Sequence, residues 1–398
     1  MNPNLTLLHP YPFEKLTQLK QGITPAIDKN HIALSIGEPK HPTPHLIQQA
    51  LLTHLHGLSG YPSTKGLPEL RSAIANWIIQ RFQLPENGVN FDTQVLPVNG
   101  TREALFSFTQ VVIDPSKKPV VIMPNPFYQI YEGAALLAGV EPYYLNTPED
   151  NNYLPDFDSV PDEIWQRCQL LFVCSPANPT GAVIGKANYQ KLINLSEQYD
   201  FVIASDECYT EIYDDEDNPP IGLLKVAYEM GNTDFKRCVM FQSLSKRSNA
   251  PGLRSGFVAG DSEILKGYFQ YRTYHGSAMA LPTQHASIAA WSDEAHVKEN
   301  RELYRAKFTA FIDILDDVCE ISKPEASFYI WLKTPFSDID FTQQLFAQQN
   351  ITVLAGSYLS RTAHGINPAK NHVRIALVAP IEECIEAAER IKSFINSL

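Results

Sequence analysis

Residues 170–209, LLFVCSPANPTGAVIGKANYQKLINLSEQYDFVIASDECY, contain two short apolar runs separated by a helix-like interval. Polar residues follow both runs: Asn178-Pro179-Thr180-Gly181 comes after Leu170–Cys174, and Asp206-Glu207-Cys208-Tyr209 comes after Phe201–Ser205. Short apolar runs bounded by Gly, Pro, Asn or Asp are typical of buried strands in a mostly parallel sheet. This stretch therefore predicts a strand–helix–strand unit of an α/β layered fold.

The same alternation continues on both sides of this stretch. Several of the intervals between the apolar runs are helix-like, as expected where helices cover a parallel sheet. We therefore expect a large α/β domain built on a mostly parallel sheet of seven strands. The other five strand-like runs are one that ends at Asn99-Gly100, Val120–Met123, Tyr143–Leu145, Val239–Gln242 and Gly256–Ala259.

A long helical pattern over residues 292–318 interrupts the alternation. The strand-like runs and helix candidates that follow it predict a second, smaller α+β unit. Residues 1–44 are rich in Pro and poor in periodicity, which predicts an extended arm that joins the smaller unit. The expected organisation is an N-terminal arm at 1–44, a large domain at 45–291 and a small C-terminal domain at 292–398.

Composition excludes several classes of protein. With 32 Lys and Arg against 44 Asp and Glu, the net charge is −12, which argues against a nucleic-acid partner. No stretch approaches the roughly 20 apolar residues of a membrane span, and no signal peptide is evident. The six cysteines include no C-x-x-C pair, and neither the histidines nor the acidic loop at 214–217 completes a metal-ligand set. We expect a cytoplasmic protein with no bound metal.

Polar side chains follow most of the predicted strands. In open α/β sheets, ligands bind beyond the carboxyl ends of the strands, so these side chains are expected to share one rim. Taken singly, each is more simply explained as a turn or a solvated side chain, and their ordered placement after successive strands is what makes the set specific. Its members are Gly100, Thr101, Arg102, Tyr128, Asn178, Asp206, Tyr209, Ser243, Ser245, Lys246 and Arg254.

These groups match the needs of pyridoxal 5'-phosphate (PLP). That cofactor requires a Lys amine for its aldehyde, an acid for its pyridine nitrogen and a donor for its ring oxygen. Lys246 would supply the amine, and the Asp206 carboxylate would keep the ring nitrogen protonated. Tyr209 and Asn178 can both serve the ring oxygen. Lys246, Asp206 and Tyr209 are therefore the expected catalytic residues.

The remaining rim residues fit the phosphate and the ring face. Arg254 can bind phosphate through two parallel hydrogen bonds. Gly100-Thr101-Arg102 opens a helix, whose backbone N–H groups and dipole attract an anion. Ser243 and Ser245 can add hydroxyl donors, and Tyr128 can stack on the ring.

Over about Ser35 to Val378, the chain resembles the fold-type I PLP-dependent transferases and, among them, the class I/II aminotransferases. The resemblance implies that Gly37 and Arg374 hold the α-carboxylate of an amino-acid substrate, with Asn178 assisting. It also implies a homodimer in which Tyr61 reaches the phosphate in the neighbouring subunit. The matching motifs are Ser35–Pro39, Gly60-Tyr61…Gly66, Asn178–Gly181, Asp206…Tyr209, Ser243…Lys246…Arg254 and Arg374.

Three longer strings resemble a narrower group, the bacterial succinyldiaminopimelate aminotransferases of lysine biosynthesis. They are LHPYPFEKL at 8–16, SIGEPKHPTP at 35–44 and NHVRIALV at 371–378. The resemblance implies transfer of an amino group from N-succinyl-LL-2,6-diaminopimelate to 2-oxoglutarate, giving N-succinyl-2-amino-6-oxopimelate and glutamate. Lys40 is a candidate partner for a distal carboxylate of that donor, and an exposed arm lysine is the equally simple alternative. The residues at 326–329 and 355–357 differ from those usual in the family, and both segments are expected on the substrate side.

Three alternatives stay open at the level of sequence. An aminotransferase for aspartate, aromatic or other amino acids would use the same rim. A PLP-dependent carbon–sulfur lyase would share its early chemistry, including proton removal by the freed Lys246 amine. A non-catalytic PLP-binding regulator is disfavoured by the acidic charge and by the short stretch that precedes Gly37.

Overall fold

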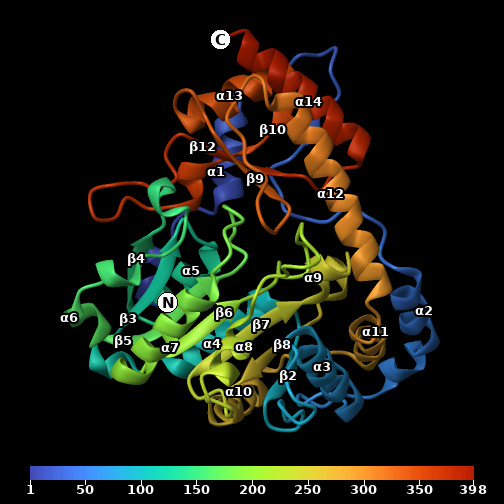
Figure 1. Ribbon diagram of the computed structural model, residues 1–398, viewed down its shortest axis with the longest axis vertical. Helices are drawn as coiled ribbons and strands as arrows, with labels where there is room; N and C mark the ends of the chain where they lie inside the picture. Colours follow the sequence, from blue (N-terminus) through green and yellow to red (C-terminus); the bar gives the residue numbers. More distant parts are fainter.

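The computed structural model describes all residues from 1 to 398, and its larger part is built on a seven-stranded sheet (Figure 1). The strand order is β2-β8-β7-β6-β5-β3-β4, and only β8 runs antiparallel to its neighbours. This confirms the expected mostly parallel seven-stranded sheet. The strands are β2 (Val95–Val98), β3 (Val120–Asn125), β4 (Glu141–Asn146), β5 (Cys168–Cys174), β6 (Val202–Asp206), β7 (Cys238–Ser243) and β8 (Gly256–Gly260).

Helices cover both faces of this sheet because successive strand residues point to opposite sides. Along β6, Ile203 packs into the core on one face and Ala204 into the core on the other. The helices on the first face are α2 (His45–Thr53), α3 (Pro68–Arg81), α6 (Asp162–Trp165), α7 (Lys186–Tyr199), α8 (Leu223–Glu229) and α11 (Leu281–Trp291), and those on the second are α4 (Thr101–Val112), α5 (Gln129–Leu137) and α10 (Ser262–His275).

A smaller α+β unit stands above the carboxyl ends of these strands in Figure 1. Its sheet has the antiparallel order β11-β12-β9, and a separate core is formed by side chains of its strands and helices. The long helix α12, orange in Figure 1, runs between the two units. The elements of this smaller unit are α12 (Ala295–Leu315), β9 (Tyr329–Lys333), α13 (Asp338–Gln349), β10 (Ile351–Thr352), β11 (Leu354–Ala355), β12 (His372–Ala376) and α14 (Ile381–Asn396).

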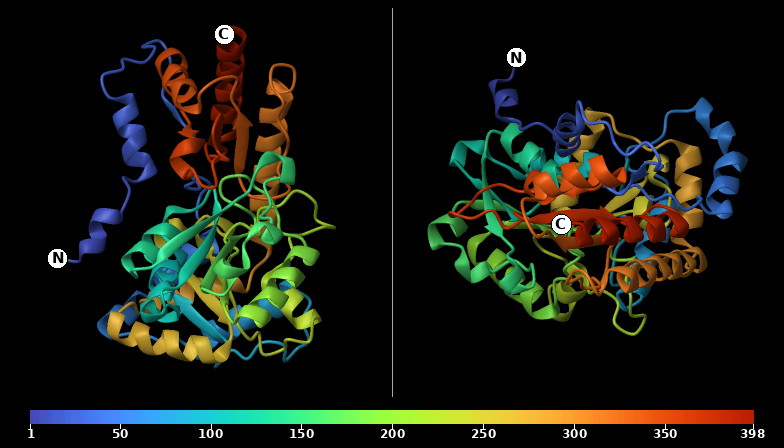
Figure 2. Two further views of the ribbon diagram at one scale, coloured as in Figure 1. Left: turned by 90° about the vertical axis from the view of Figure 1, so that its left-hand side faces the viewer. Right: turned by 90° about the horizontal axis from the view of Figure 1, so that it is seen from above.

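The N-terminal segment lies against both units. Strand β1 (Ile32–Ala33) pairs in parallel with β10 of the smaller unit. Helix α1 (Pro12–Lys20) packs on β11 and α13, whereas the short helix at Pro3–Leu7 packs on α5 of the larger unit. Figure 2 shows this segment running down one side of the molecule. The domain boundaries at residues 44 and 291 stay a prediction.

The extended conformation predicted for the arm is wrong over Pro12–Lys20, which is helical. Helix signals are present there: Pro12 occupies the first turn, Glu14 lies near the positive end of the helix dipole and Lys20 near the negative end. The helix buries Leu16 against Leu354 and Leu359, residues far away in the sequence. Tertiary packing of this kind is what stabilises so short a helix.

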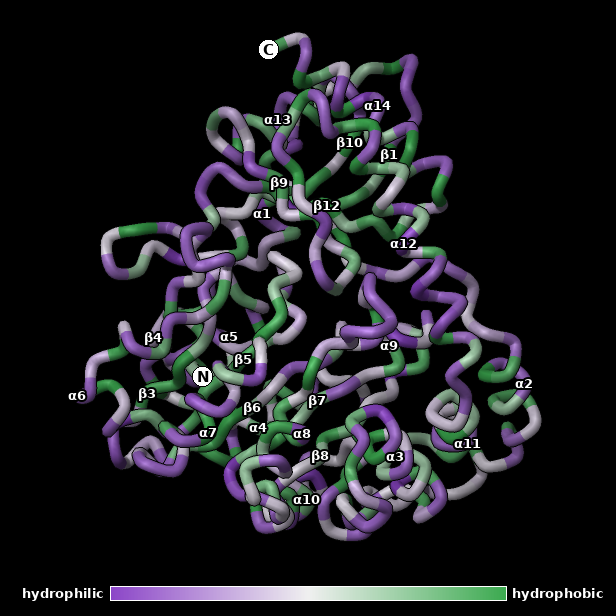
Figure 3. Tube along the Cα trace, in the orientation of Figure 1, coloured by the Kyte–Doolittle hydropathy of each residue, from purple (hydrophilic) through white to green (hydrophobic).

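Hydrophobic residues follow the strands of the large sheet, and hydrophilic residues alternate with them on the outer helices (Figure 3). This pattern is expected where a sheet is buried on both faces and its covering helices have one face in water. None of the helices combines the length and the apolar content needed to cross a lipid bilayer.

Candidate active site

A cleft lies between the two units, with about 1450 Å³ of empty space including its open mouth. Its walls come from the strand ends of the large sheet, from the N-terminal segment at Tyr11–Phe13 and Ile36–Glu38, and from the smaller unit. The sequence-predicted residues that line it are Gly37, Thr101, Arg102, Tyr128, Asn178, Asp206, Tyr209, Ser243, Ser245, Lys246, Arg254 and Arg374.

Lys246 projects from α9 (Leu244–Arg247), a short helix that begins directly after β7. Ser243 caps this helix, since its hydroxyl accepts a hydrogen bond from the Ser245 backbone N–H over 3.0 Å. The Lys246 amine donates to the carbonyl oxygen of Gly37. Burial lowers the pKa of Lys246 to about 8, and the positive charge of Arg374 acts in the same direction. A substantial neutral fraction at mild pH suits an amine that must attack an aldehyde.

Asp206 ends β6, the residue is 4% exposed, and no basic side chain lies within salt-bridge distance of its carboxylate. One carboxylate oxygen accepts the Tyr131 hydroxyl over 2.7 Å, and the other accepts the Cys208 backbone N–H over 3.3 Å. Burial raises the pKa of Asp206, and these hydrogen bonds oppose the rise. A buried carboxylate that lacks a cationic partner is suited to a protonated pyridine nitrogen.

Gly100 and Arg254 form the other end of the rim. Gly100 has φ of 83° at the start of α4, and a Cβ there would lie 2.3 Å from an Nη atom of Arg254. Only glycine permits this approach. Arg254 donates to the Pro251 carbonyl oxygen over 2.9 Å and makes no salt bridge, which leaves guanidinium N–H groups for an anion beside the α4 N-terminus.

Arg374, on β12, brings the smaller unit to the rim. It donates to Oδ1 of Asn178 over 2.8 Å and to the Ser35 carbonyl oxygen over 2.7 Å, while its buried Nε has no partner. A Cβ at Gly37 would lie 2.0 Å from the Tyr329 hydroxyl, so this position also requires glycine. An unpaired buried guanidinium N–H beside Gly37 is suited to a substrate carboxylate.

Tyrosines complete the walls of the cleft. The hydroxyls of Tyr209 and Tyr329 lie 3.0 Å apart, and burial raises the pKa of Tyr209 well above its ordinary value. Arg102 donates to the Tyr128 hydroxyl over 2.8 Å and to the Tyr11 hydroxyl over 3.1 Å, and no carboxylate neutralises it. Arg102, on α4, therefore places a positive charge at the cleft, next to the wall formed by the N-terminal segment.

Sequence reasoning missed Tyr131, Tyr329 and the Tyr11–Phe13 wall. Tyr131 lies one helical turn after Tyr128, which was a usable signal. Tyr329 belongs to the 326–329 segment, whose residues differ from those usual in the family. No local signal placed Tyr11 at the cleft, because its approach depends on the packing of α1 against the smaller unit.

Gly100 does not itself line the cleft, although it adjoins Thr101 and Arg254, which do. Two other residues proposed from the sequence do not lie at the cleft of this chain. Tyr61 is fully exposed. Lys40 is also exposed and does not line the cleft, and its charge acts instead on the pKa of His31, Lys307 and Cys384. The exposed-lysine alternative for Lys40 fits this placement.

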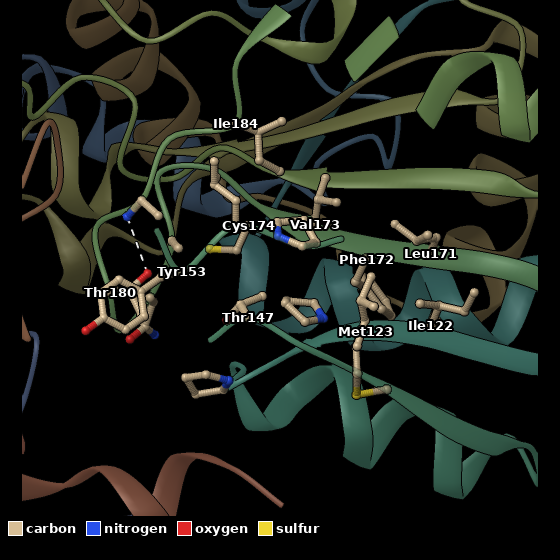
Figure 4. Close-up of a pocket in the computed structure, with 18 of the residues that line it drawn as sticks. Ile122, Met123, Thr147, Tyr153, Leu171, Phe172, Val173, Cys174, Thr180 and Ile184 are labelled. Carbon is tan, nitrogen blue, oxygen red and sulfur yellow. Dashed lines mark hydrogen bonds between the residues drawn. The ribbon is translucent and has the colours of Figure 1, made fainter. Parts of the chain in front are cut away.

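A second, narrower pocket lies behind the Asn178 loop (Figure 4). Its walls are largely apolar and are formed by strand residues such as Ile122 and Leu171, with Tyr153 and Cys174 as its titratable side chains. Burial raises the pKa of both groups. The pocket therefore offers packing behind the loop and no reactive group for chemistry.

Comparison with known proteins agrees with this geometry. The model of the family described as "Aminotransferase class I and II" matches residues 29–391. The chain belongs to the class I and II aminotransferases. The cofactor of this aminotransferase family is PLP, so the fold, the family and the cofactor expected from the sequence are confirmed.

Relatives and solved structures cover nearly the whole aminotransferase chain. The LL-diaminopimelate aminotransferase of Aquifex aeolicus is 32% identical over 98% of this chain and 97% of its own. That of Syntrophobacter fumaroxidans is 32% identical over the same shares. A crystal structure of an aminotransferase from Neisseria meningitidis has a TM-score of 0.95 and 51% identity, covering 99% of this chain and 100% of its own. The aminotransferase AspB of Helicobacter pylori has a TM-score of 0.90 and 35% identity, covering 98% of this chain and 100% of its own.

Proposed function

We propose that this aminotransferase acts in the diaminopimelate route to lysine. Its amino donor would be N-succinyl-LL-2,6-diaminopimelate and its acceptor 2-oxoglutarate, with N-succinyl-2-amino-6-oxopimelate and glutamate as products. The observation that carries the proposal is a cleft with three arginines around Lys246. Arg254 suits the cofactor phosphate, Arg374 suits an α-carboxylate, and Arg102 is left for a further carboxylate of the substrate.

In this reaction Lys246 would hold the cofactor aldehyde, Asp206 its ring nitrogen, and Gly100 and Arg254 its phosphate. The bound cofactor supplies an electron sink for the bond that breaks at the donor Cα. The released Lys246 amine would take the proton from Cα as general base and return it at the cofactor carbon. Arg374 and the Gly37 backbone would orient the donor so that its Cα–H faces this amine.

Tyr209 and Tyr329 would support the same geometry from the two units. Tyr209 lies in the large unit and Tyr329 in the smaller one, and their hydroxyls are within hydrogen-bond distance. This contact would close one wall of the cleft and shield a bound donor from water, which strengthens each charged contact.

LL-diaminopimelate is the second candidate donor. It is favoured by the names of the relatives, which are LL-diaminopimelate aminotransferases rather than succinylated-substrate enzymes. Both donors carry a distal carboxylate that Arg102 could bind. They differ at the distal amine: in the succinylated donor the ammonium group is converted to an amide, and the succinyl group adds one more carboxylate.

A donor panel with 2-oxoglutarate tests this function. The panel contains succinylated and free LL-diaminopimelate, aspartate, an aromatic amino acid and alanine, and glutamate formation is measured. We expect the highest kcat/KM for the succinylated donor. Arg102→Leu should raise the KM for donors with a distal carboxylate by about 10- to 150-fold, the effect of one charged hydrogen bond.

Two controls make this panel decisive. Alanine, which has no distal carboxylate, should respond little to Arg102→Leu, and the exposed Arg167→Leu should leave every donor unchanged. A preference for aspartate or an aromatic donor contradicts the diaminopimelate assignment. In a separate assay with a cysteine-type donor, release of the β-substituent without glutamate formation would favour the carbon–sulfur lyase alternative.

We also propose a homodimer in which Tyr61 enters the neighbouring site. Tyr61 is fully exposed, and Leu52 and Leu58 close to it in the chain are 62% and 66% exposed, a patch that a second copy could cover.

A subunit-mixing experiment tests this arrangement. Tyr61→Ala and Lys246→Ala subunits are each defective, but a hybrid dimer would contain one site with both residues intact. Activity should therefore return on mixing, and its absence would contradict action across the interface.

A further inference from the structure

A chain of polar side chains, with Lys307 and Asn300 buried and His41 partly buried, leads from α12 to the backbone of Lys246. The Lys307 amine lies 2.6 Å from Nε2 of His41, and Nδ1 of His41 lies 3.0 Å from Oδ1 of Asn300. The Asn300 amide nitrogen lies 3.2 Å from the Lys246 carbonyl oxygen and 3.3 Å from that of Arg247, and it donates to both. The chain therefore ends on the peptide of the residue proposed to hold the cofactor.

The donors and acceptors of this chain fit one arrangement. Oδ1 of Asn300 also accepts the Asn249 amide over 2.9 Å, so it is the acceptor for His41, which must carry its proton on Nδ1. Nε2 of His41 is then free to accept a hydrogen bond from the Lys307 amine. Burial lowers the pKa of His41, which favours the neutral imidazole that this arrangement requires.

The same N-terminal segment also touches the tip of Lys246. The Gly37 carbonyl accepts a hydrogen bond from the Lys246 amine, and the Ser35 carbonyl accepts one from Arg374. The segment from Ser35 to His41 thus holds the side chain of Lys246 directly and its main chain through Asn300. A shift of this segment would move the amine relative to the groups that face the donor.

We propose that His41 and Asn300 are positioning residues for Lys246. Asn300 fixes the direction in which the lysine leaves α9 by hydrogen-bonding its peptide, His41 orients Asn300, and Lys307 holds His41 in the required tautomer. A reacting group displaced by about 1 Å can lose on the order of 100-fold in rate. The proposal rests on Lys246 as the cofactor lysine and does not depend on the identity of the donor.

Acid would break this chain. A protonated His41 loses its Nε2 acceptor and places a second positive charge beside Lys307. Burial also lowers the pKa of Lys307, to about 8, so its amine is mostly protonated below that pH and mostly neutral above it. The other groups that face Lys307 and His41 are the Val378 carbonyl, Tyr304, Cys384, Glu382 and Lys40.

Asn300→Asp tests the proposal, because it keeps the side-chain shape and removes the donor to the Lys246 carbonyl. We expect kcat to fall by about 10- to 100-fold with little change in KM. We also expect the midpoint of the pH titration of the bound cofactor's visible absorbance to shift. Thr43→Val is the matched control: it removes a 2.8 Å hydrogen bond from just beyond this segment to the Asn249 carbonyl, and Thr43 makes no hydrogen bond to His41, Asn300 or Lys246. Its kcat and midpoint should match the wild-type values.

His41 gives a second test if Asn300→Asp does not fold. His41→Asn keeps a donor for Asn300, whereas His41→Gln reaches toward Lys307 and loses that donor, so His41→Asn should retain the higher kcat. An unchanged absorbance midpoint in Asn300→Asp, or equal losses in Asn300→Asp and Thr43→Val, overturns the proposal. The absorbance needs only bound cofactor, so inactivity toward diaminopimelates would contradict the proposed donor and leave this readout intact.

Discussion

Lys246→Ala should lower kcat by about 10⁴-fold or more, because one substitution removes both the proposed cofactor anchor and the proposed general base. No other amine lines the cleft, so no neighbouring side chain can replace it. The variant should also lose the visible absorbance that arises when PLP is linked to the lysine. Absorbance spectra of the PLP-saturated protein and single-turnover glutamate formation measure the two effects.

Lys40→Ala is the matched control for this lysine. Lys40 is exposed and lies outside the cleft, so turnover, absorbance and the KM for the succinylated donor should all stay at wild-type values. A raised KM in this variant would restore Lys40 as a partner of the distal carboxylate. Near-normal turnover in Lys246→Ala would contradict the proposed mechanism as a whole.

The pH dependence of cofactor binding follows from the same residue. The pKa of Lys246 lies near 8 in the cofactor-free protein, below its ordinary value of 10.5. The amine is therefore mostly protonated and unreactive below pH 8 and mostly neutral above it. The rate of recombination with PLP should rise with pH and level off above a midpoint near 8. A midpoint close to 10 would show that burial does not act on this amine as the structure indicates.

Asp206→Asn should lower kcat by about 10²- to 10³-fold, the range seen when one preorganised electrostatic contact to a transition state is removed. The amide keeps the size of the side chain and loses the negative charge that we propose holds the ring nitrogen protonated. Electron withdrawal from the donor Cα then weakens, so the slowed step should be proton removal. A larger isotope effect for donors deuterated at Cα, measured together with kcat, would report this step.

Glu207→Gln provides the control for Asp206→Asn. Glu207 is the next residue, is equally buried, and points away from the cleft toward Ser205 and the Leu223 backbone. Burial raises its pKa to about 7, so much of this carboxyl is already protonated at neutral pH and glutamine replaces it closely. Turnover should stay within about threefold of wild type, since the Glu207 side chain points away from the cleft and its replacement does not alter the carboxylate proposed for the ring nitrogen. A loss in Glu207→Gln that equals the loss in Asp206→Asn would assign the effect to packing rather than to charge.

The strand ends of the large sheet could be predicted because their signals are local. Asn178, Asp206 and Lys246 each follow a short apolar run, and the carboxyl ends of parallel strands meet at one edge of the sheet. Placing each residue after its strand was therefore enough to place the residues together. Arg374 and Gly37 could not be placed in this way, and they entered only through their resemblance to a known family.

Other parts of the site depended on contacts between distant segments. Tyr11 reaches Arg102 because α1 packs on the smaller unit, and Tyr329 reaches Tyr209 from a different sheet. The helix of the N-terminal arm was missed because so short a helix gains its stability from packing rather than from propensity. The Asn300–His41–Lys307 chain joins α12 to the N-terminal segment, and no spacing in the sequence links His41 to that helix.

The sequence alone determined the sheet and the order of polar residues at its edge, and it supplied the proposal that Lys246 and Asp206 serve the cofactor. These depend on hydrophobic periodicity and strand direction, which are encoded over a few residues at a time. Only the tertiary structure decided that Lys40 lies away from the cleft, that Arg102 faces Tyr11, and that Asn300 holds the peptide of Lys246. The reason is physical: the position of a long side chain is set by the packing and hydrogen bonds of segments that meet only in the folded chain.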